Sequence, residues 1–260
     1  MKILFIGDIF GKPGRNILRQ KLRDVQVKYD IDLTIGNGEN AAGGTGITRK
    51  IFEEISNYGV DVITTGNHVW DKKEILDFID SEPRILRPAN FPSGAPGKGY
   101  NIYTVGQTKI AVINMSGRIF LPPLDCPFQK IDGIINEIKG ITKIIILDFH
   151  AEATSEKQAM GWYLDGRVSA VIGTHTHVQT ADARLLKRGT AYITDVGMTG
   201  PYDSVLGVNK DLIINKFVTQ LPVRFEVAGG DIQLNAVIID ISANGRASKI
   251  IPFQTILESY

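Results

Sequence analysis

Two patterns of apolar residues alternate along the chain, short unbroken runs and longer stretches with helical spacing. Residues 3–6 form a continuous apolar run, which is typical of a strand that is buried on both faces. After Pro13, apolar residues recur three or four positions apart as far as Tyr29, which predicts a helix with one apolar face. This alternation of strand and helix continues to residue 172.

The complete pattern predicts a layered α/β fold. Strands are predicted at residues 3–6, 32–35, 60–65, 100–105, 109–115, 143–147 and 168–172, and helices at 13–29, 48–58, 72–79, 128–139 and 155–164. Gly106-Gln107 lies between two of the strands and predicts a hairpin. Further strands are predicted at 190–194, 223–227, 232–241 and 249–253, with little helix between them, so the last part of the chain is expected to be β-rich and antiparallel.

Composition and charge narrow the class of protein. The 260 residues, 43% of them hydrophobic, suffice for one substantial core, and no linker divides them, which predicts a single domain over residues 1–260. Lys and Arg number 29 against 28 Asp and Glu, so the net charge is +1. A concentrated basic face is therefore not expected, which argues against a stable complex with nucleic acid but not against a small phosphorylated substrate.

The single cysteine and the lack of long apolar stretches predict a cytoplasmic protein. One cysteine, Cys126, excludes an intramolecular disulfide and a Cys-rich zinc site, and a passive role for it is favoured over a catalytic one. No stretch approaches the roughly 20 apolar residues of a membrane span. Homo-oligomerisation is left open by the sequence.

Polar residues gather where the predicted strands end, and these residues carry the functional signal. They are Asp8, Glu39, Asn40, Asn67, His68, His150, His175 and His177, and they include all four histidines of the chain. Strand ends of an α/β sheet form the crevice in which ligands bind. Taken singly, Asp8 has an equally good interpretation as a helix cap, Glu39 as a solvated charge and Asn67 as a turn residue. Their coincidence at strand ends favours a shared site.

Carboxylate, amide oxygen and imidazole are the usual ligands of divalent Mn, Fe or Zn, so the residue types predict a metal site. The set is large enough for two ions. Two ions about 3.5–4 Å apart can hold a hydroxide and clamp a phosphoryl group.

These motifs resemble those of the calcineurin-like metallophosphoesterase superfamily. Its ordered blocks, D-x-H, G-D-x-x-D, G-N-H-D/E, a lone H and G-H-x-H, are similar to the segments of this chain between residues 8 and 177. Residues 2–14, 38–41 and 66–70 resemble the YmdB-like branch more closely still, and that resemblance extends along the whole chain. It implies an αββα sandwich with a β-rich C-terminal part.

The resemblance also implies a role for each residue. One metal ion would be held by Asp8, Glu39, Asn40 and His177, and the other by Glu39, Asn67, His150 and His175. Glu39 would bridge the two ions, Fe or Mn, and His68 would be the general acid rather than a ligand. The implied activity is a phosphodiesterase for 2′,3′-cyclic nucleotides, and 3′,5′-cyclic nucleotides as a second class, in which a metal-bound hydroxide attacks phosphorus in line with the leaving oxygen.

The chain departs from the wider superfamily pattern at three positions. Phe10 stands where D-x-H has a histidine, a loss that Asn40 would compensate in the YmdB-like branch. Glu39 replaces the usual bridging aspartate, and Val69 replaces an acid that would orient His68. Asp71 or a backbone carbonyl is expected to orient His68 instead.

Two other classes of function compete with the enzyme. The first is a regulatory or binding protein that keeps the metal site with weak catalysis or none, which the complete ligand set disfavours. The second is a dinucleotide-binding module, since Gly36-x-Gly38-x-x-Ala41 fits a loose fingerprint. Glu39 lies within that loop and would repel a pyrophosphate, so this class is rejected.

Several residues outside the motifs are weaker candidates for substrate contacts. Phe10, Trp70 and Tyr202 could line a nucleobase pocket, but burial in the core is the favoured interpretation for aromatic residues. Arg15 and Arg118 could contact phosphate, but solvated surface is favoured for both.

Overall fold

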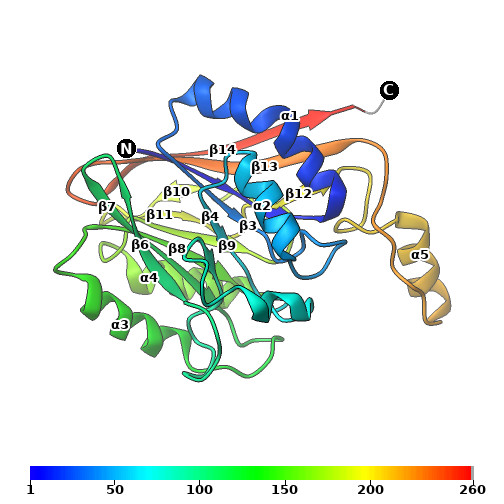
Figure 1. Cartoon of the computed structure of the whole chain (residues 1–260), viewed down its shortest axis with the longest axis horizontal. Coiled ribbons are helices and arrows are strands. Elements are labelled where there is room, and N and C mark those ends of the chain that lie inside the picture. Colours follow the sequence, from blue (N-terminus) through cyan, green and yellow to red (C-terminus); the bar gives the residue numbers. More distant parts are fainter. Residues whose placement is uncertain (259–260) are drawn as a thin grey trace.

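The apolar runs of the sequence form two β-sheets in the computed structural model, which describes residues 1–258 (Figure 1). The first sheet has the strand order β2-β12-β13-β1-β3-β4-β5, with β14 paired to β13. Its strands are β1 (Lys2–Ile6), β2 (Asp8–Ile9), β3 (Leu33–Asn37), β4 (Val62–Thr64), β5 (Ile85–Leu86), β12 (Met198–Pro201), β13 (Ile232–Ile241) and β14 (Ala247–Leu257). β1, β3, β4 and β5 are parallel, whereas β13 runs antiparallel to both β1 and β14.

The second sheet has the order β10-β11-β9-β8-β7-β6. Its strands are β6 (Tyr100–Val105), β7 (Thr108–Ser116), β8 (Ile144–His150), β9 (Ala170–Thr174), β10 (Arg184–Leu185) and β11 (Ala191–Ile193). The four central strands are parallel, and the edge strands β6 and β10 are antiparallel to their neighbours. The predicted hairpin at Gly106-Gln107 is the turn between β6 and β7.

Helices cover the outer face of each sheet. α1 (Gly11–Tyr29) and α2 (Arg49–Asn57) pack on the first sheet, and α3 (Pro127–Ile138) and α4 (Thr154–Leu164) pack on the second. α2 begins where Thr48 Oγ1 accepts a hydrogen bond from the backbone N–H of Ile51 at 3.4 Å. The resulting order of layers, helix, sheet, sheet and helix, confirms the predicted αββα sandwich.

The alternation of side chains along the strands explains why residues 3–6 and 144–147 are all apolar. In β1, Ile3 and Phe5 point into the core between the two sheets, whereas Leu4 and Ile6 point toward α1. In β8, Ile144 and Ile146 face the same inter-sheet core, and Ile145 and Leu147 face α3 and α4. Both faces of these strands are buried, so every position along them is apolar until the strand approaches its end.

Three expectations from the sequence are wrong or incomplete. Residues 72–79 form only a short 3-10 helix, η1 (Lys73–Asp77). Residues 223–227 form no strand within the described residues 1–258, because the single bridge from Val208 to Val227 leads to no sheet. The segment before them contains an unpredicted helix, α5 (Lys210–Thr219), which Asn209 caps by accepting a hydrogen bond from Asp211 N–H at 2.9 Å. In Figure 1, α5 stands apart from the two sheets.

Among residues 1–258, no helix has the length and apolar character needed to cross a membrane.

Candidate metal centre

The predicted site residues converge where the carboxyl ends of five parallel strands meet. Asp8 follows β1, Glu39 and Asn40 follow β3, and Asn67 and His68 follow β4. His150 is the last residue of β8, and His175 and His177 come directly after β9. The first three strands belong to one sheet and the last two to the other, so the site lies at the shared edge of the sandwich.

One group of donor atoms surrounds the imidazole of His150. Its Nε2 atom lies 3.1 Å from Glu39 Oε1, 3.1 Å from Asn67 Oδ1 and 3.0 Å from His175 Nδ1. Atoms of Glu39, His150 and His175 all lie within 4.8 Å of one another. A single proton on His150 Nε2 can satisfy only one of these close contacts, whereas a cation among the four atoms would satisfy all of them.

A second group of donor atoms is joined to the first by Glu39. Asn40 Nδ2 lies 3.1 Å from Glu39 Oε1 and 3.1 Å from His177 Nε2. Asp8 Oδ1 lies 3.9 Å from His177 Nε2 and, although fully buried, has no hydrogen-bond partner among residues 1–258. An unpaired buried carboxylate oxygen is costly, so this atom fits a metal ligand. Asn40 would bind through oxygen once its amide is turned over, which exchanges the Oδ1 and Nδ2 positions.

The neighbours of His150 fix which of its nitrogens faces the centre. Thr174 Oγ1 lies 2.9 Å from His150 Nδ1 and donates its own proton to Asp148 Oδ1 at 2.7 Å. Because a hydroxyl has one proton, Thr174 must accept from Nδ1–H. In its neutral form His150 therefore presents the Nε2 lone pair to Glu39 and Asn67, as a metal ligand requires.

The other two histidines at the centre are held in the same manner. His175 Nε2 lies 3.0 Å from the carboxylate of Glu152, and His177 Nδ1 lies 3.1 Å from the backbone carbonyl of Leu206. Both partners only accept, so these nitrogens carry the proton and the opposite nitrogens, His175 Nδ1 and His177 Nε2, keep their lone pairs for the centre. In their neutral forms all three imidazoles thus present an unprotonated nitrogen to the centre, which fits divalent metal ions.

Burial and mutual attraction set the charges at the centre in the absence of a metal. Burial raises the pKa of Asp8 to about 6. Burial would also raise the pKa of Glu39, but the adjacent His150 outweighs it and holds that pKa at about 2. Burial opposes the charged form of His150, yet Glu39 raises its pKa to about 9, whereas burial and the charge of His150 lower the pKa of His175 to about 3. A divalent ion would replace the proton that His150 and Glu39 share.

The backbone at the two histidines after β9 is strained. His175 has φ 102° and His177 has φ 67°, a region that residues with a side chain rarely adopt. Thr176, between them, donates from both its backbone nitrogen and its hydroxyl to Asp195 Oδ2 at 2.9 and 2.8 Å. Lys157 Nζ pairs with the same carboxylate oxygen at 2.7 Å in a fully buried position. Strain held in place by such anchors is typical of functional sites.

Close packing around the ligands explains one glycine of the site. A Cβ atom at Gly66 would lie 2.2 Å from Glu39 Oε2 and 2.4 Å from His150 Nε2. Only glycine allows these ligands to approach the loop after β4.

His68 stands at the rim of the centre. Its Nδ1 atom lies 2.9 Å from Asp71 Oδ2, and 36% of its side chain is exposed. Together with Glu39, His175 and His177 it lines a cavity of about 260 Å³. Of the two expected partners for His68, the structure therefore has Asp71.

The weaker candidates from the sequence mostly have structural roles. Arg15 donates to the backbone carbonyl of Ala41 at 2.6 Å and to Glu54 at 3.0 Å, so it supports the loop after β3 rather than reaching into the cavity. Phe10 is only 5% exposed and packs edge-on against His177, with 5.7 Å between the ring centroids. Neither face of Phe10 is free for a nucleobase.

Trp70 and Tyr202 differ in how much of the ring is free. Trp70 packs edge-on against Phe91 at a centroid distance of 5.6 Å and joins the core under α2. Tyr202, in the segment after β12, is 46% exposed.

Sequence reasoning missed the residues that support the ligands. They are Asp148, Glu152, Lys157, Thr174 and Asp195. The available signal was a charged or polar residue within or beside an otherwise apolar buried segment, as at Asp148 and Thr174.

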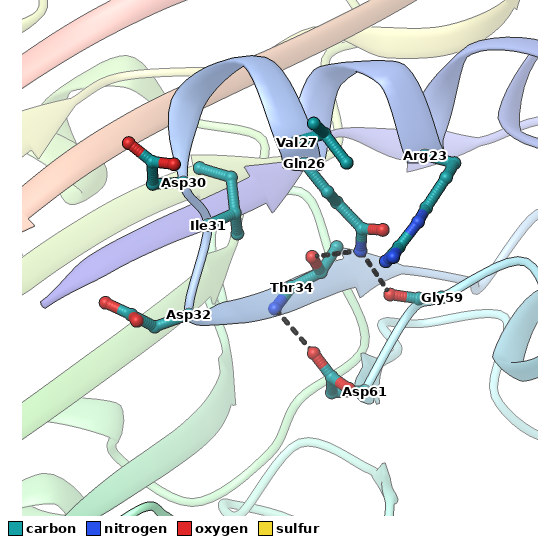
Figure 2. A pocket seen from close by; sticks show the side chains of 9 residues that line it. All are labelled: Arg23, Gln26, Val27, Asp30, Ile31, Asp32, Thr34, Gly59 and Asp61. Carbon is teal, nitrogen blue, oxygen red and sulfur yellow. Dashed lines mark hydrogen bonds between the residues drawn. The ribbon is translucent and has the colours of Figure 1, made fainter.

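A larger cavity, of about 500 Å³, lies at the opposite, amino-terminal ends of β3 and β4 (Figure 2). It is bordered by the end of α1 and by the residues that precede β3 and β4, including Asp32 and Asp61. The hydrogen bonds in it are internal, since Asp61 accepts from Thr34 N–H at 2.8 Å and Gln26 donates to Thr34 Oγ1 at 2.9 Å. This cavity shares no residue with the metal centre.

Comparisons with known proteins agree with this geometry. A family model described as "YmdB-like protein" matches residues 4–253. A 2′,3′-cyclic-nucleotide 2′-phosphodiesterase of Bacillus subtilis (strain 168) is 56% identical over 257 residues, which cover 99% of this chain and 97% of the relative. The crystal structure of a hypothetical protein from Thermus thermophilus matches with a TM-score of 0.94 at 42% identity, over 100% of both chains. The NAD nucleotidase NadN of Haemophilus influenzae has a similar fold, with a TM-score of 0.62 at 16% identity over 98% of this chain and 56% of that chain.

Proposed function

The chain belongs to the YmdB-like protein family, as its strand-end motifs predict, and we propose that it is a metal-dependent phosphodiesterase. The proposed substrates are 2′,3′-cyclic nucleotides, the class named for the Bacillus subtilis relative, with 3′,5′-cyclic nucleotides as a second class. The observation that carries this proposal is the convergence of Glu39, His150 and His175 within 4.8 Å, with the outer nitrogen of each imidazole already engaged.

Two divalent ions, Fe or Mn, would occupy the centre. Asp8, Glu39, Asn40 and His177 would hold one ion, and Glu39, Asn67, His150 and His175 the other. Nitrogen and oxygen donors without thiolate suit these metals. When bound, such ions supply an activated water as nucleophile near neutral pH and neutralise charge on the phosphoryl oxygens.

His68 would deliver the proton to the departing ribose oxygen. Asp71 accepts from His68 Nδ1–H, which leaves Nε2 as the atom that carries the transferable proton. The exposure of His68 at the cavity rim suits a group that meets the leaving oxygen rather than the metal. The cytoplasmic location and the lack of a stable nucleic-acid complex stay predictions from the sequence.

The proposal is tested with metal-stripped protein refilled with Mn²⁺ or Fe²⁺ and assayed on bis-p-nitrophenyl phosphate and 2′,3′-cyclic AMP. Turnover should require the metal. Glu39→Ala should abolish both turnover and metal content. Glu53 is an exposed glutamate on α2, so Glu53→Ala should change neither. His68→Ala should lower turnover by roughly 10²–10⁴-fold and keep the metal.

Two outcomes would redirect this interpretation. A folded protein that binds metal but hydrolyses neither substrate would favour the regulatory or binding protein. Loss of metal from the His68→Ala variant would show that His68 is a ligand or a structural residue.

A further inference from the structure

The loop that follows β7 leaves the sheet directly beside the metal centre. Ser116, the last residue of β7, is paired in register with His150, the last residue of β8. Gly117 N–H then donates to the backbone carbonyl of His150 at 2.9 Å. The loop therefore starts at the strand edge where the metal ligands gather.

The base of this loop is held rigidly against α4. Glu156 accepts hydrogen bonds from the backbone N–H groups of Arg118, at 3.0 Å, and Ile119, at 3.3 Å. A Cβ atom at Gly117 would lie 2.5 Å from Glu156 Oε2 and 2.6 Å from Ala151 Cβ, so the backbone packs closely against the start of the helix. These contacts hold residues 117–119 in place next to the end of β8.

The loop presents an aromatic ring to solvent in a strained conformation. Phe120 is 88% exposed and has φ 60°, in the left-handed region. Both features are unfavourable, because an aromatic side chain gains free energy by burial and a residue with a Cβ atom is disfavoured at positive φ. A strained, exposed ring on a loop that starts beside the metal ligands points to a role for the ring in binding.

The metal centre itself offers no comparable aromatic surface. In the part of the chain that the structure describes, Phe10 is the one Phe, Tyr or Trp among the residues that line the cavity, and its faces are buried. Two residues lie between Gly117 and Phe120, so their Cα atoms are at most roughly 11 Å apart along extended chain. Phe120 thus stays on the side of the molecule where β8 ends at His150.

We propose that Phe120 is the platform on which the nucleobase of the substrate stacks while its phosphate is bound at the metal centre. This inference rests on the proposed function and extends it to the nucleoside part of the substrate. Every nucleobase has a π-face, so stacking on Phe120 tolerates different bases and adds affinity that a cyclic phosphate without a base does not obtain.

The experiment compares 2′,3′-cyclic AMP with glycerol 1,2-cyclic phosphate, a five-membered cyclic phosphodiester that has no base. In the metal-loaded enzyme, Phe120→Ala should raise KM for 2′,3′-cyclic AMP by roughly 5- to 100-fold and leave the kinetics on the glycerol substrate unchanged. Phe120→Trp should restore the low KM. The matched control is Phe217→Ala, since Phe217 is 71% exposed on α5 and should affect neither substrate.

Calorimetric binding to the same metal-loaded proteins provides a readout that does not depend on turnover. Phe120→Ala should weaken the binding of adenosine 3′-monophosphate by the same factor by which it raises KM, and should leave the affinity for inorganic phosphate unchanged. Equal losses on both substrates, no loss on either, or a selective loss only in Tyr202→Ala would overturn the assignment of Phe120. Lack of turnover in the wild type on both substrates would refute the proposed function, and the binding comparison would still decide the role of Phe120.

Discussion

The hydroxyl of Thr174 determines which nitrogen of His150 faces the metal centre, and removing it is the sharpest test of this site. Thr174→Val keeps the shape of the side chain and removes Oγ1. In the native protein this atom accepts from His150 Nδ1 at 2.9 Å and donates to Asp148 at 2.7 Å. All three residues are fully buried, so water cannot replace the lost partner without rearrangement.

The expected magnitude has two parts. Leaving a buried donor or acceptor without a partner costs about 1–3 kcal/mol of stability. In addition, an imidazole that is no longer held as the Nδ1–H tautomer can carry its proton on Nε2 and turn an N–H toward the ion. Loss of such a supporting contact typically weakens metal binding by about 10–100-fold, which corresponds to about 1.4–2.7 kcal/mol.

The assay is competition for Mn²⁺ between the protein and a chelator, together with urea unfolding of the metal-free protein. The matched control is Thr190→Val, because Thr190 is equally buried and donates to the carbonyl of Val168 at 2.7 Å, at the opposite end of the strands. Both variants should lose stability, but only Thr174→Val should lose metal affinity. Thr174→Ser should recover both. Equal Mn²⁺ affinities of Thr174→Val and Thr190→Val would refute this role of the Thr174 hydroxyl.

Three further predictions concern pH, the proposed acid and α5. In the metal-free protein the pKa of His150 is raised to about 9. Its pairing with Glu39 therefore stabilises the fold fully below the ordinary imidazole pKa of about 6.5, and this stabilisation is lost as the pH rises through about 9. Urea unfolding between these pH values should show the free energy of unfolding decrease. A decrease of equal size in Glu39→Gln would contradict this role of the pair. Asp71→Asn should lower kcat by less than the roughly 10²–10⁴-fold expected when the general acid is removed, and the variant should keep its metal. Reduced metal content, measured by atomic absorption, would argue against the role of Asp71 in orienting His68. Of the ten described residues of α5 only Ile213 is buried, and a helix of that length is marginal by itself in water. The backbone amides of α5 should therefore exchange hydrogen faster than those of β13. Slow exchange in α5 would show that another surface, such as a second copy of the chain, covers this helix.

The arrangement of layers could be predicted because burial on both sides of a sheet leaves a simple signature. Where a strand is covered on both faces, every position is apolar, and the runs at residues 3–6 and 144–147 show this directly. The error at residues 223–227 has the opposite origin, since an apolar segment becomes a strand only if a neighbouring strand offers hydrogen-bond partners. Only Val227 finds a bridge, to Val208.

The ligand set could be proposed because strand ends converge in parallel sheets whatever the details of packing. Asp8, Glu39 and Asn67 each come directly after a parallel strand of the first sheet, and their convergence follows from strand direction alone. Glu152 and Asp71 gave no such signal. Each is a partly exposed carboxylate in a loop or near a helix start, and its significance depends on a histidine that lies 3.0 or 2.9 Å away in the folded protein.

The contacts beneath the ligands depend on how the two sheets are placed against each other, and no local pattern in the sequence encodes that placement. Asp148 on β8 accepts from Asn37 on β3 at 3.0 Å, from Thr64 on β4 and from Thr174 on β9. Asn37 and Asp148 are 111 positions apart in the chain and belong to different sheets. A carboxylate inside a buried strand is nevertheless unfavourable unless it is fully hydrogen-bonded. Asp148 therefore joins the edges of the two sheets directly beneath the centre, and through Thr174 the same carboxylate fixes the tautomer of His150. The acid in the apolar run marks a buried polar contact, but only the fold shows that its partners belong to the other half of the metal centre.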